Sequence, residues 1–178
     1  MKFVETKISG VFEIELFHVK DERGSFTKSF HKSLFKTNKL EYKFDESFFS
    51  INKKGVIRGM HFQNPPHDQA KLVYVTSGVI LDVILDLRKS SPTYRQYAKV
   101  EISAENSKAV YMPVGVAHGF CCLTDATMIY LTTTEYNAKS ETGILWNSFG
   151  MKWPVQNPIL SPRDKSFLPF GKFQTPFE

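Results

Sequence analysis

Short runs of alternating apolar and polar residues recur along the chain. Phe12, Ile14 and Leu16 are separated by glutamates, and this two-residue period is typical of a strand with one buried face. The apolar runs at residues 100–102 and 110–112 are equally short and are separated by polar residues. The pattern therefore predicts a series of short strands.

Two longer β-rich regions contain turn signals. Residues 73–87 divide into two runs at Gly78, and residues 120–133 divide into two runs at a turn around Asp125. Each arrangement predicts a β-hairpin, because a short polar or glycine-containing turn joins two apolar runs. Residues 31–40 are the only segment that favours a helix, and that helix should be short.

Short strands at this spacing predict an all-β antiparallel barrel or double-sheet jelly roll. A chain of 178 residues suits one domain with a sizeable core, so we expect residues 1–178 to form a single unit. Hydrophobic residues at 42% and aromatic residues at 14% are sufficient for a packed interior. The tail from Ser161 onward is rich in Phe and Pro, and we expect it to cover the barrel as irregular chain.

The charge balance indicates which kind of ligand the protein could bind. The formal net charge is +5, and no run of Lys or Arg exceeds two, so the sequence favours a phosphate-bearing small molecule over nucleic acid. The only cysteines, Cys121 and Cys122, are adjacent and poorly placed for a disulfide, which indicates a reducing compartment. The chain shows neither a signal peptide nor a membrane span, so we expect a cytoplasmic protein without a membrane partner.

One short segment concentrates polar chemistry. Arg58, His61 and Lys71 lead into a strand, and three-residue spacing requires a bend at Gly59 to aim the first two into one cavity. Two cations around a titratable base suit an anionic substrate that undergoes proton transfer. The alternative is that both cations are exposed at strand ends and that the histidine belongs to the core.

A second motif runs from Pro113 to His118 and has the Pro-x-Gly-x-x-His form, which resembles the second motif of cupin barrels. The alternative is an ordinary turn followed by a core histidine. His61 and His118 could supply two nitrogen ligands to a metal. However, the first motif has one histidine where metal-binding cupins have His-x-His, so we expect no metal.

Two further residues allow a structural and a functional interpretation. Tyr130 lies in an apolar strand and is either a core residue or, facing a histidine across a cavity, a proton donor. Asp164 is either a solvated turn residue or the group that orients His61 and stabilises its imidazolium form.

Several segments together resemble the dTDP-4-dehydrorhamnose 3,5-epimerase family over roughly residues 5 to 168. The segments are residues 55–63, 69–73, 81–83, 87–93, 115–120 and 158–164. The resemblance implies a cupin-like jelly roll, a double-stranded β-helix barrel, without metal or organic cofactor. It also implies a homodimer that exchanges strands near the N-terminus.

The resemblance further implies a reaction and its residues. The enzyme would invert C3, C5 or both in a nucleotide-linked 4-keto-6-deoxyhexose, by default dTDP-4-dehydro-6-deoxyglucose. His61 would be the general base with Asp164 as its partner, Lys71 would stabilise the enolate, and Tyr130 would be the acid on the opposite face. The expected substrate-binding residues are Arg23, Lys28, Glu46, Phe48, Arg58, Gln63, His118, Tyr136, Glu141 and Arg163.

The sequence departs from the family on the nucleotide side. Lys28 replaces a glutamate, while Glu46 and Phe48 replace a glutamine and an asparagine. We derive the hypothesis that CDP or GDP replaces dTDP as carrier, with Lys28 paired to Glu46 or to the base. The alternative functions are a single-centre epimerase or ketoisomerase on such a substrate, and a binding module that has lost catalysis.

Overall fold

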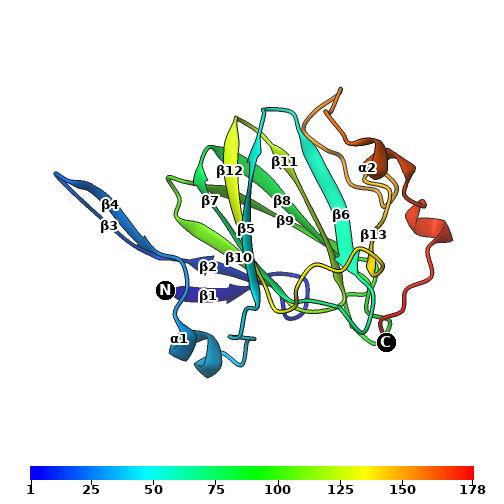
Figure 1. Cartoon of the computed structure of the whole chain (residues 1–178), viewed down its shortest axis with the longest axis horizontal. Coiled ribbons are helices and arrows are strands. Elements are labelled where there is room, and N and C mark those ends of the chain that lie inside the picture. Colours follow the sequence, from blue (N-terminus) through cyan, green and yellow to red (C-terminus); the bar gives the residue numbers. More distant parts are fainter.

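Two antiparallel sheets stack face to face in the computed structural model, which describes residues 1–178 (Figure 1). In spatial order, the six-stranded sheet contains β1 Lys2–Glu5, β2 Phe12–Glu15, β10 Lys108–Met112, β7 Lys71–Ser77, β12 Ala126–Thr132 and β5 Glu46–Asn52. The five-stranded sheet contains β13 Glu141–Gly143, β6 Ile57–Gln63, β11 Val116–Cys122, β8 Val79–Asp86 and β9 Tyr97–Ser103. The all-β jelly roll predicted from the sequence is confirmed.

A separate two-stranded arm and short helices complete the chain. The arm, β3 Phe17–Asp21 with β4 Gly24–Lys28, projects away from the sandwich (Figure 1). The predicted helix is confirmed in shorter form as α1 Lys32–Thr37, and a 3-10 turn, η1, covers Phe170–Lys172. No helix in the structure has the length and apolar character required to cross a membrane.

The C-terminal tail is less irregular than the sequence analysis expected. It contains the helix α2, Pro162–Ser166. Ser161 caps this helix by accepting a hydrogen bond from the Asp164 N–H, and Pro162 occupies the first turn, where a missing N–H costs nothing. The Ser-Pro pair was therefore a usable helix-start signal.

Both hairpin predictions are wrong. β7 pairs with β10 and β12, whereas β8 pairs with β9 and β11, so the chain crosses between sheets at Gly78. It crosses again between β11 and β12. The crossings pack together: Gly78 has φ +77°, and a Cβ there would lie 2.0 Å from the Asp125 carbonyl oxygen. A strand pattern identifies the buried face but does not identify the pairing partner.

Apolar side chains fill three regions. The largest cluster lies between the two sheets and includes Ile84, Val110 and Met128. A second cluster packs the C-terminal tail against the five-stranded sheet, as Phe177 does against Phe62. The tail therefore covers the barrel as predicted. The third cluster lies around Phe35 of α1, against β2, β7 and β10.

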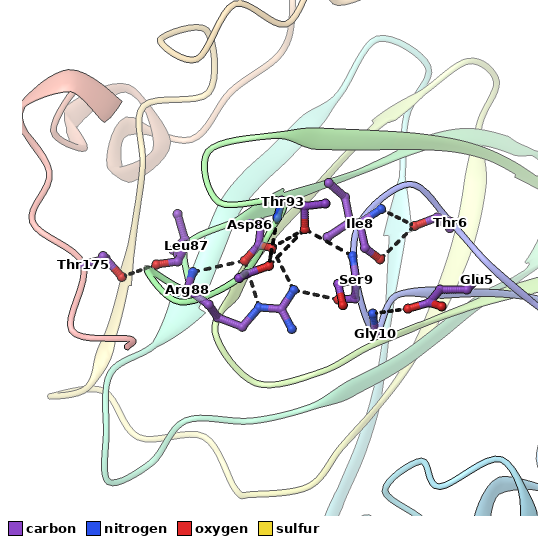
Figure 2. Close-up of polar contacts among 11 residues, drawn as sticks. Glu5, Thr6, Ile8, Ser9, Gly10, Asp86, Leu87, Arg88, Thr93 and Thr175 are labelled. Carbon is purple, nitrogen blue, oxygen red and sulfur yellow. Dashed lines mark hydrogen bonds and ion pairs between the residues drawn. The ribbon is translucent and has the colours of Figure 1, made fainter.

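A buried ionic network fastens the N-terminal segment to the end of β8 (Figure 2). Asp86 accepts hydrogen bonds from Arg88 Nε at 2.8 Å, Ser91 Oγ at 2.6 Å and Thr93 Oγ1 at 2.7 Å. Arg88 Nη2 also donates to the Ser9 carbonyl oxygen at 2.6 Å. Burial alone would raise the pKa of Asp86, but these donors together lower it below its usual value.

Replacing Asp86 by alanine should lower the free energy of unfolding by about 3 to 5 kcal/mol at pH 7, because Arg88 would lose its buried partner. The folded-state pKa of Asp86 is depressed, so its contribution is present above the unfolded-state pKa near 3.8 and is lost as pH falls through the folded value. Urea unfolding at pH 7 and in acid would measure both effects.

The matched control is Glu178→Ala, which breaks the exposed Lys89–Glu178 ion pair. That change should cost less than about 1 kcal/mol, since exposed pairs are screened by solvent. An Asp86 variant that is as stable as the Glu178 variant would contradict the importance of the network.

Candidate active site

A cavity of about 320 Å³ lies between the sheets, with walls from β5, β6, β7, β11 and β12. Most of the predicted site residues line it: His61, Lys71, Tyr130, Glu46, Phe48, Arg58, His118, Tyr136, Glu141 and Arg163. Asp164 lies behind His61. The two sheets therefore bring together residues that are far apart in the sequence.

The cavity also has lining residues that the sequence analysis did not name. These are Ser50, Gln69, Phe120 and Thr132. Each stands two positions along the chain from a residue that was named. The two-residue period of a strand could therefore have identified them.

A bulge in β6 aims Arg58 and His61 into the same cavity. His61 pairs with His118 and Arg58 pairs with Phe120, so β6 has one more residue than β11 between these pairs. Gly59, with φ +141°, takes up the extra residue, and a Cβ there would lie 2.5 Å from Gly119 Cα. The bend expected at Gly59 is confirmed, and only glycine fits it.

His61 and Asp164 form a buried pair. The His61 Nε2 atom lies 2.8 Å from Asp164 Oδ1, and Asp164 is 2% exposed. Burial lowers the pKa of His61, with Asp164 opposing and Lys71 adding to the decrease. Burial would raise the pKa of Asp164, but hydrogen bonds that include the one from His61 lower it. The ionised Asp164 accepts a hydrogen bond from His61 Nε2–H, so Nδ1 is unprotonated and free to accept a proton.

Tyr130 and Lys71 stand on the opposite sheet. Tyr130 pairs with Val73 and Thr132 pairs with Lys71, so Tyr130 and Lys71 share one face. Burial lowers the pKa of Lys71 to about 8, with opposition from Glu141 and Asp82. Burial raises the pKa of Tyr130, which keeps its hydroxyl protonated at neutral pH.

A second His–Asp pair lies at the base of the cavity. The His118 Nε2 atom lies 2.7 Å from Asp82 Oδ1, and both residues are buried. Asp82 Oδ2 has no hydrogen-bond partner, and burial raises the pKa of this carboxyl group. Asp82 lies within residues 81–83, one of the segments that carry the family resemblance, but no local sequence pattern predicts its contact with His118.

The rim of the cavity is held by ionic and backbone contacts. Arg163 pairs with Glu141, and Glu46 Oε2 accepts a hydrogen bond from the Tyr136 N–H at 2.8 Å. Arg58 Nε donates to Asn52 Oδ1 at 2.7 Å. The rim thus combines cations with carboxylates that already form an ion pair or a hydrogen bond within the chain.

The structure does not place Gln63 in the cavity. Its side chain is 1% exposed and lies beneath residues 133–140, which we call the rim loop. Gln63 Nε2 donates to the carbonyl oxygens of His67 at 2.7 Å and Glu135 at 3.2 Å, and Oε1 accepts from the Asn137 N–H at 2.6 Å. Gln63 therefore holds the loop that carries Tyr136.

Arg23 and Lys28 also lie outside the cavity of this chain. Both belong to the projecting arm, where Arg23 pairs with Asp21 and Lys28 lies over the Phe17 ring at 5.9 Å. The ion pair expected between Lys28 and Glu46 is absent within the chain. The arm extends away from the sandwich (Figure 1), and none of its residues lines the cavity.

The donors in the cavity do not form a metal-ligand set. No group of three or more His, Cys, Asp or Glu side chains is placed to hold a metal ion. His61 and His118 are neighbours across β6 and β11, but each is already bonded through Nε2 to its own aspartate.

The class that the fold and the site define is a cupin-type jelly roll whose cavity places a His–Asp pair opposite a tyrosine and a lysine. The family model described as dTDP-4-dehydrorhamnose 3,5-epimerase matches residues 5–172. The chain belongs to this family.

Individual relatives agree with this assignment. The chain is 42% identical over 170 residues to the dTDP-4-dehydrorhamnose 3,5-epimerase of Shigella flexneri, covering 92% of this chain and 93% of the relative. It is 36% identical over 165 residues to the dTDP-4-dehydrorhamnose 3-epimerase of Streptomyces niveus, covering 90% and 80%.

A solved structure extends the comparison to a bound ligand. The fold matches dTDP-6-deoxy-D-glucose-3,5-epimerase from Legionella pneumophila in complex with dTDP-4-keto-L-rhamnose. The TM-score is 0.94 at 32% identity, covering 99% of this chain and 98% of the other.

Replacing Gln63 by alanine should loosen the rim loop, because the Glu135 carbonyl oxygen and the Asn137 N–H lose their hydrogen-bond partner and the His67 carbonyl oxygen loses one of its donors. Loss of these hydrogen bonds should lower the free energy of local opening by about 1 to 3 kcal/mol. Amide exchange in the loop should then be roughly 5- to 150-fold faster. Hydrogen–deuterium exchange of residues 134–141 measures the effect. Gln156→Ala, an exposed glutamine, is the control. Unchanged protection in the Gln63 variant would show that this residue does not hold the loop.

Proposed function

We propose that the chain inverts C3 and C5 of a dTDP-linked 4-keto-6-deoxyglucose by proton transfer. The observation that carries this proposal is the placement of His61 and Tyr130 on opposite sheets across one cavity. The dTDP-4-keto sugar in the Legionella pneumophila relative supports the substrate class. Family membership supports the reaction.

The proposed chemistry starts at the carbon atoms that flank the ketone. The C4 carbonyl group acidifies the protons at C3 and C5, and His61 Nδ1 removes one of them while Asp164 stabilises the imidazolium form. Charge then develops on O4, where the Lys71 ammonium group stabilises the enolate. Tyr130 returns a proton from the opposite face, which inverts the centre. This route requires no cofactor.

Binding of the carrier uses the charged rim. Arg58 and Arg163 suit the diphosphate, because guanidinium groups bind phosphate oxygens in a bidentate manner. We infer a homodimer in which the arm of one copy brings Arg23 and Lys28 to the cavity of the other. The exposed arm and its apolar Phe26, which is 57% exposed, support this inference.

Packing of the two sheets on each other and of the C-terminal tail on the five-stranded sheet supports one domain over residues 1–178. Cys121 and Cys122 are buried and free, which fits a reducing cytoplasm. Direct contact of Gln63 with substrate is the least supported role, because that side chain lies outside the cavity.

The alternatives differ in the carbon attacked and in the carrier. Similarity to a 3-epimerase of Streptomyces niveus favours a single-centre enzyme as the second candidate. A ketoisomerase would use the same enolate but return the proton elsewhere. Glu46 and Phe48 line the cavity, which keeps a CDP- or GDP-linked substrate as a testable variant. A pure binding module is disfavoured because the proposed base, acid and enolate stabiliser are all present.

Proton NMR in deuterated water tests the proposal. With the dTDP-linked 4-keto sugar, deuterium should appear at C3 and C5 with inversion. His61→Asn should lower exchange by roughly 100- to 10,000-fold, since the base is lost. Tyr130→Phe should retain exchange but lose inversion. Tyr94→Phe, which removes a hydroxyl outside the cavity, is the control.

The same experiment separates the alternatives. Exchange at C3 alone would favour the 3-epimerase, and faster exchange with CDP- or GDP-linked sugars would favour a different carrier. Absence of exchange with all three substrates would overturn the proposed function.

The pH dependence of kcat/KM should be bell-shaped. His61 must be neutral to act as the base, so the acid limb should lie below its ordinary pKa of 6.5. Lys71 must be charged, so activity should fall above pH about 8. Glu141→Gln removes a carboxylate that raises the pKa of Lys71 and should move the alkaline limb to lower pH. An alkaline limb that does not respond to this change would contradict the role of Lys71.

A further inference from the structure

A chain of hydrogen bonds ends at the hydroxyl group of Tyr130. Arg58 Nε donates to Asn52 Oδ1 at 2.7 Å, and Asn52 Nδ2 donates to Ser50 Oγ at 3.0 Å. Ser50 Oγ lies 3.3 Å from Tyr130 Oη. Ser50 is the only side chain that forms a hydrogen bond with this hydroxyl group.

Donor chemistry fixes the direction of the first two bonds. A guanidinium group can only donate, so Asn52 Oδ1 must accept and its Nδ2 group must face Ser50. Asn52 is buried, and Nδ2 also donates to the Ser50 carbonyl oxygen at 3.1 Å. Ser50 Oγ therefore accepts from Asn52, and its own proton is free to point at Tyr130.

Strand geometry explains why these groups meet. Asn52, Ser50 and Phe48 occupy alternate positions of β5 and so share one face. Tyr130 of β12 pairs with Phe48 and stacks on its ring at 4.6 Å, which holds the phenol beside Ser50. The β6 bulge at Gly59 brings Arg58 to the other end of the chain of hydrogen bonds.

We infer that Ser50, oriented by Asn52 and Arg58, is a positioning residue that stabilises the phenolate form of Tyr130. The inference rests on the proposed function, in which Tyr130 gives its proton to the enolate carbon. The electron pair of that O–H bond remains on Tyr130 Oη, and the Ser50 proton stays on Oγ while its hydrogen bond strengthens. Hydrogen bonds aligned from the exposed Arg58 through the buried Asn52 to the buried Tyr130 reinforce one another.

The electrostatics of Tyr130 agree with this geometry. Burial raises the pKa of Tyr130, whereas the hydrogen bond with Ser50 and the charge of Arg58 both lower it. Without these donors, the phenolate would form in a buried site with no partner, which is costly.

The step that Ser50 serves is protonation rather than abstraction, and this separates its role from general support of the site. When Tyr130 donates slowly, the enolate regains deuterium from the His61 side, so exchange continues without inversion. Ser50→Ala should lower the rate of inversion by about 10- to 100-fold, the effect of one hydrogen bond to a charged group. KM and the rate of exchange should change by less than about 3-fold.

Proton NMR in deuterated water with the dTDP-linked 4-keto sugar measures inversion and exchange together. Ser50→Thr keeps the hydroxyl group and should retain inversion. Asn52→Asp keeps the acceptor for Arg58 but loses the donor to Ser50, and it should lower inversion in the same direction. Ser47→Ala is the matched control, because Ser47 lies on β5 but donates to the Tyr130 carbonyl oxygen at 3.1 Å. It should leave the ratio of exchange to inversion unchanged.

A double variant completes the test. In the Tyr130→Phe background, Ser50→Ala should have no further effect on exchange, since Ser50 would act only through the lost hydroxyl group. Full inversion in Ser50→Ala, an equal loss of inversion and exchange, or a further loss in the double variant would overturn the inference alone. A wild-type protein without any exchange would overturn the proposed function and the inference with it.

Discussion

The close approach of β6 and β11 at Gly59 and Gly119 is the constraint on which the cavity depends. A Cβ on Gly119 would lie 2.8 Å from the Arg58 carbonyl oxygen, so neither glycine leaves room for a side chain. Their contact allows β6 to hold an extra residue, and that residue turns Arg58 to the same face as His61. Without the bulge, three-residue spacing would direct one of these side chains away from the cavity.

The C-terminal tail completes the site from outside the sandwich. Asp164 reaches His61 because α2 is capped by Ser161 and packed beside β6. The aspartate orients the imidazole and leaves Nδ1 unprotonated, so a segment far along the chain decides which nitrogen can act as a base. Burial lowers the pKa of His61, whereas hydrogen bonds lower the pKa of Asp164, so near neutral pH the imidazole is neutral and the carboxylate is ionised.

The two walls of the cavity carry different tasks. The five-stranded sheet supplies His61 and the His118–Asp82 pair, whereas the six-stranded sheet supplies Lys71, Tyr130 and the donors that lead to it. In the proposed reaction, a proton leaves one face of the sugar ring and returns to the other. The opposition arises because the chain crosses between sheets at Gly78 and again after β11, where the sequence pattern had predicted hairpins.

The sequence by itself determined the strand-rich composition and the buried faces of the strands. Through its motifs and the family resemblance, it also indicated His61, Lys71, Tyr130 and Asp164 as candidate site residues. Local alternation and residue chemistry carry that information. Tertiary structure alone decided which strands pair, because a turn that joins two strands of one sheet and a turn that crosses between the two sheets have the same short sequence signals. It also decided that Gln63 lies beneath the rim loop and that Arg23 and Lys28 lie on the arm, outside the cavity of their own chain. The hydrogen bonds of Asp82 with His118 and of Ser50 with Tyr130 likewise depend on the tertiary structure. Those contacts join residues distant in sequence, and no local pattern encodes a partner on another strand.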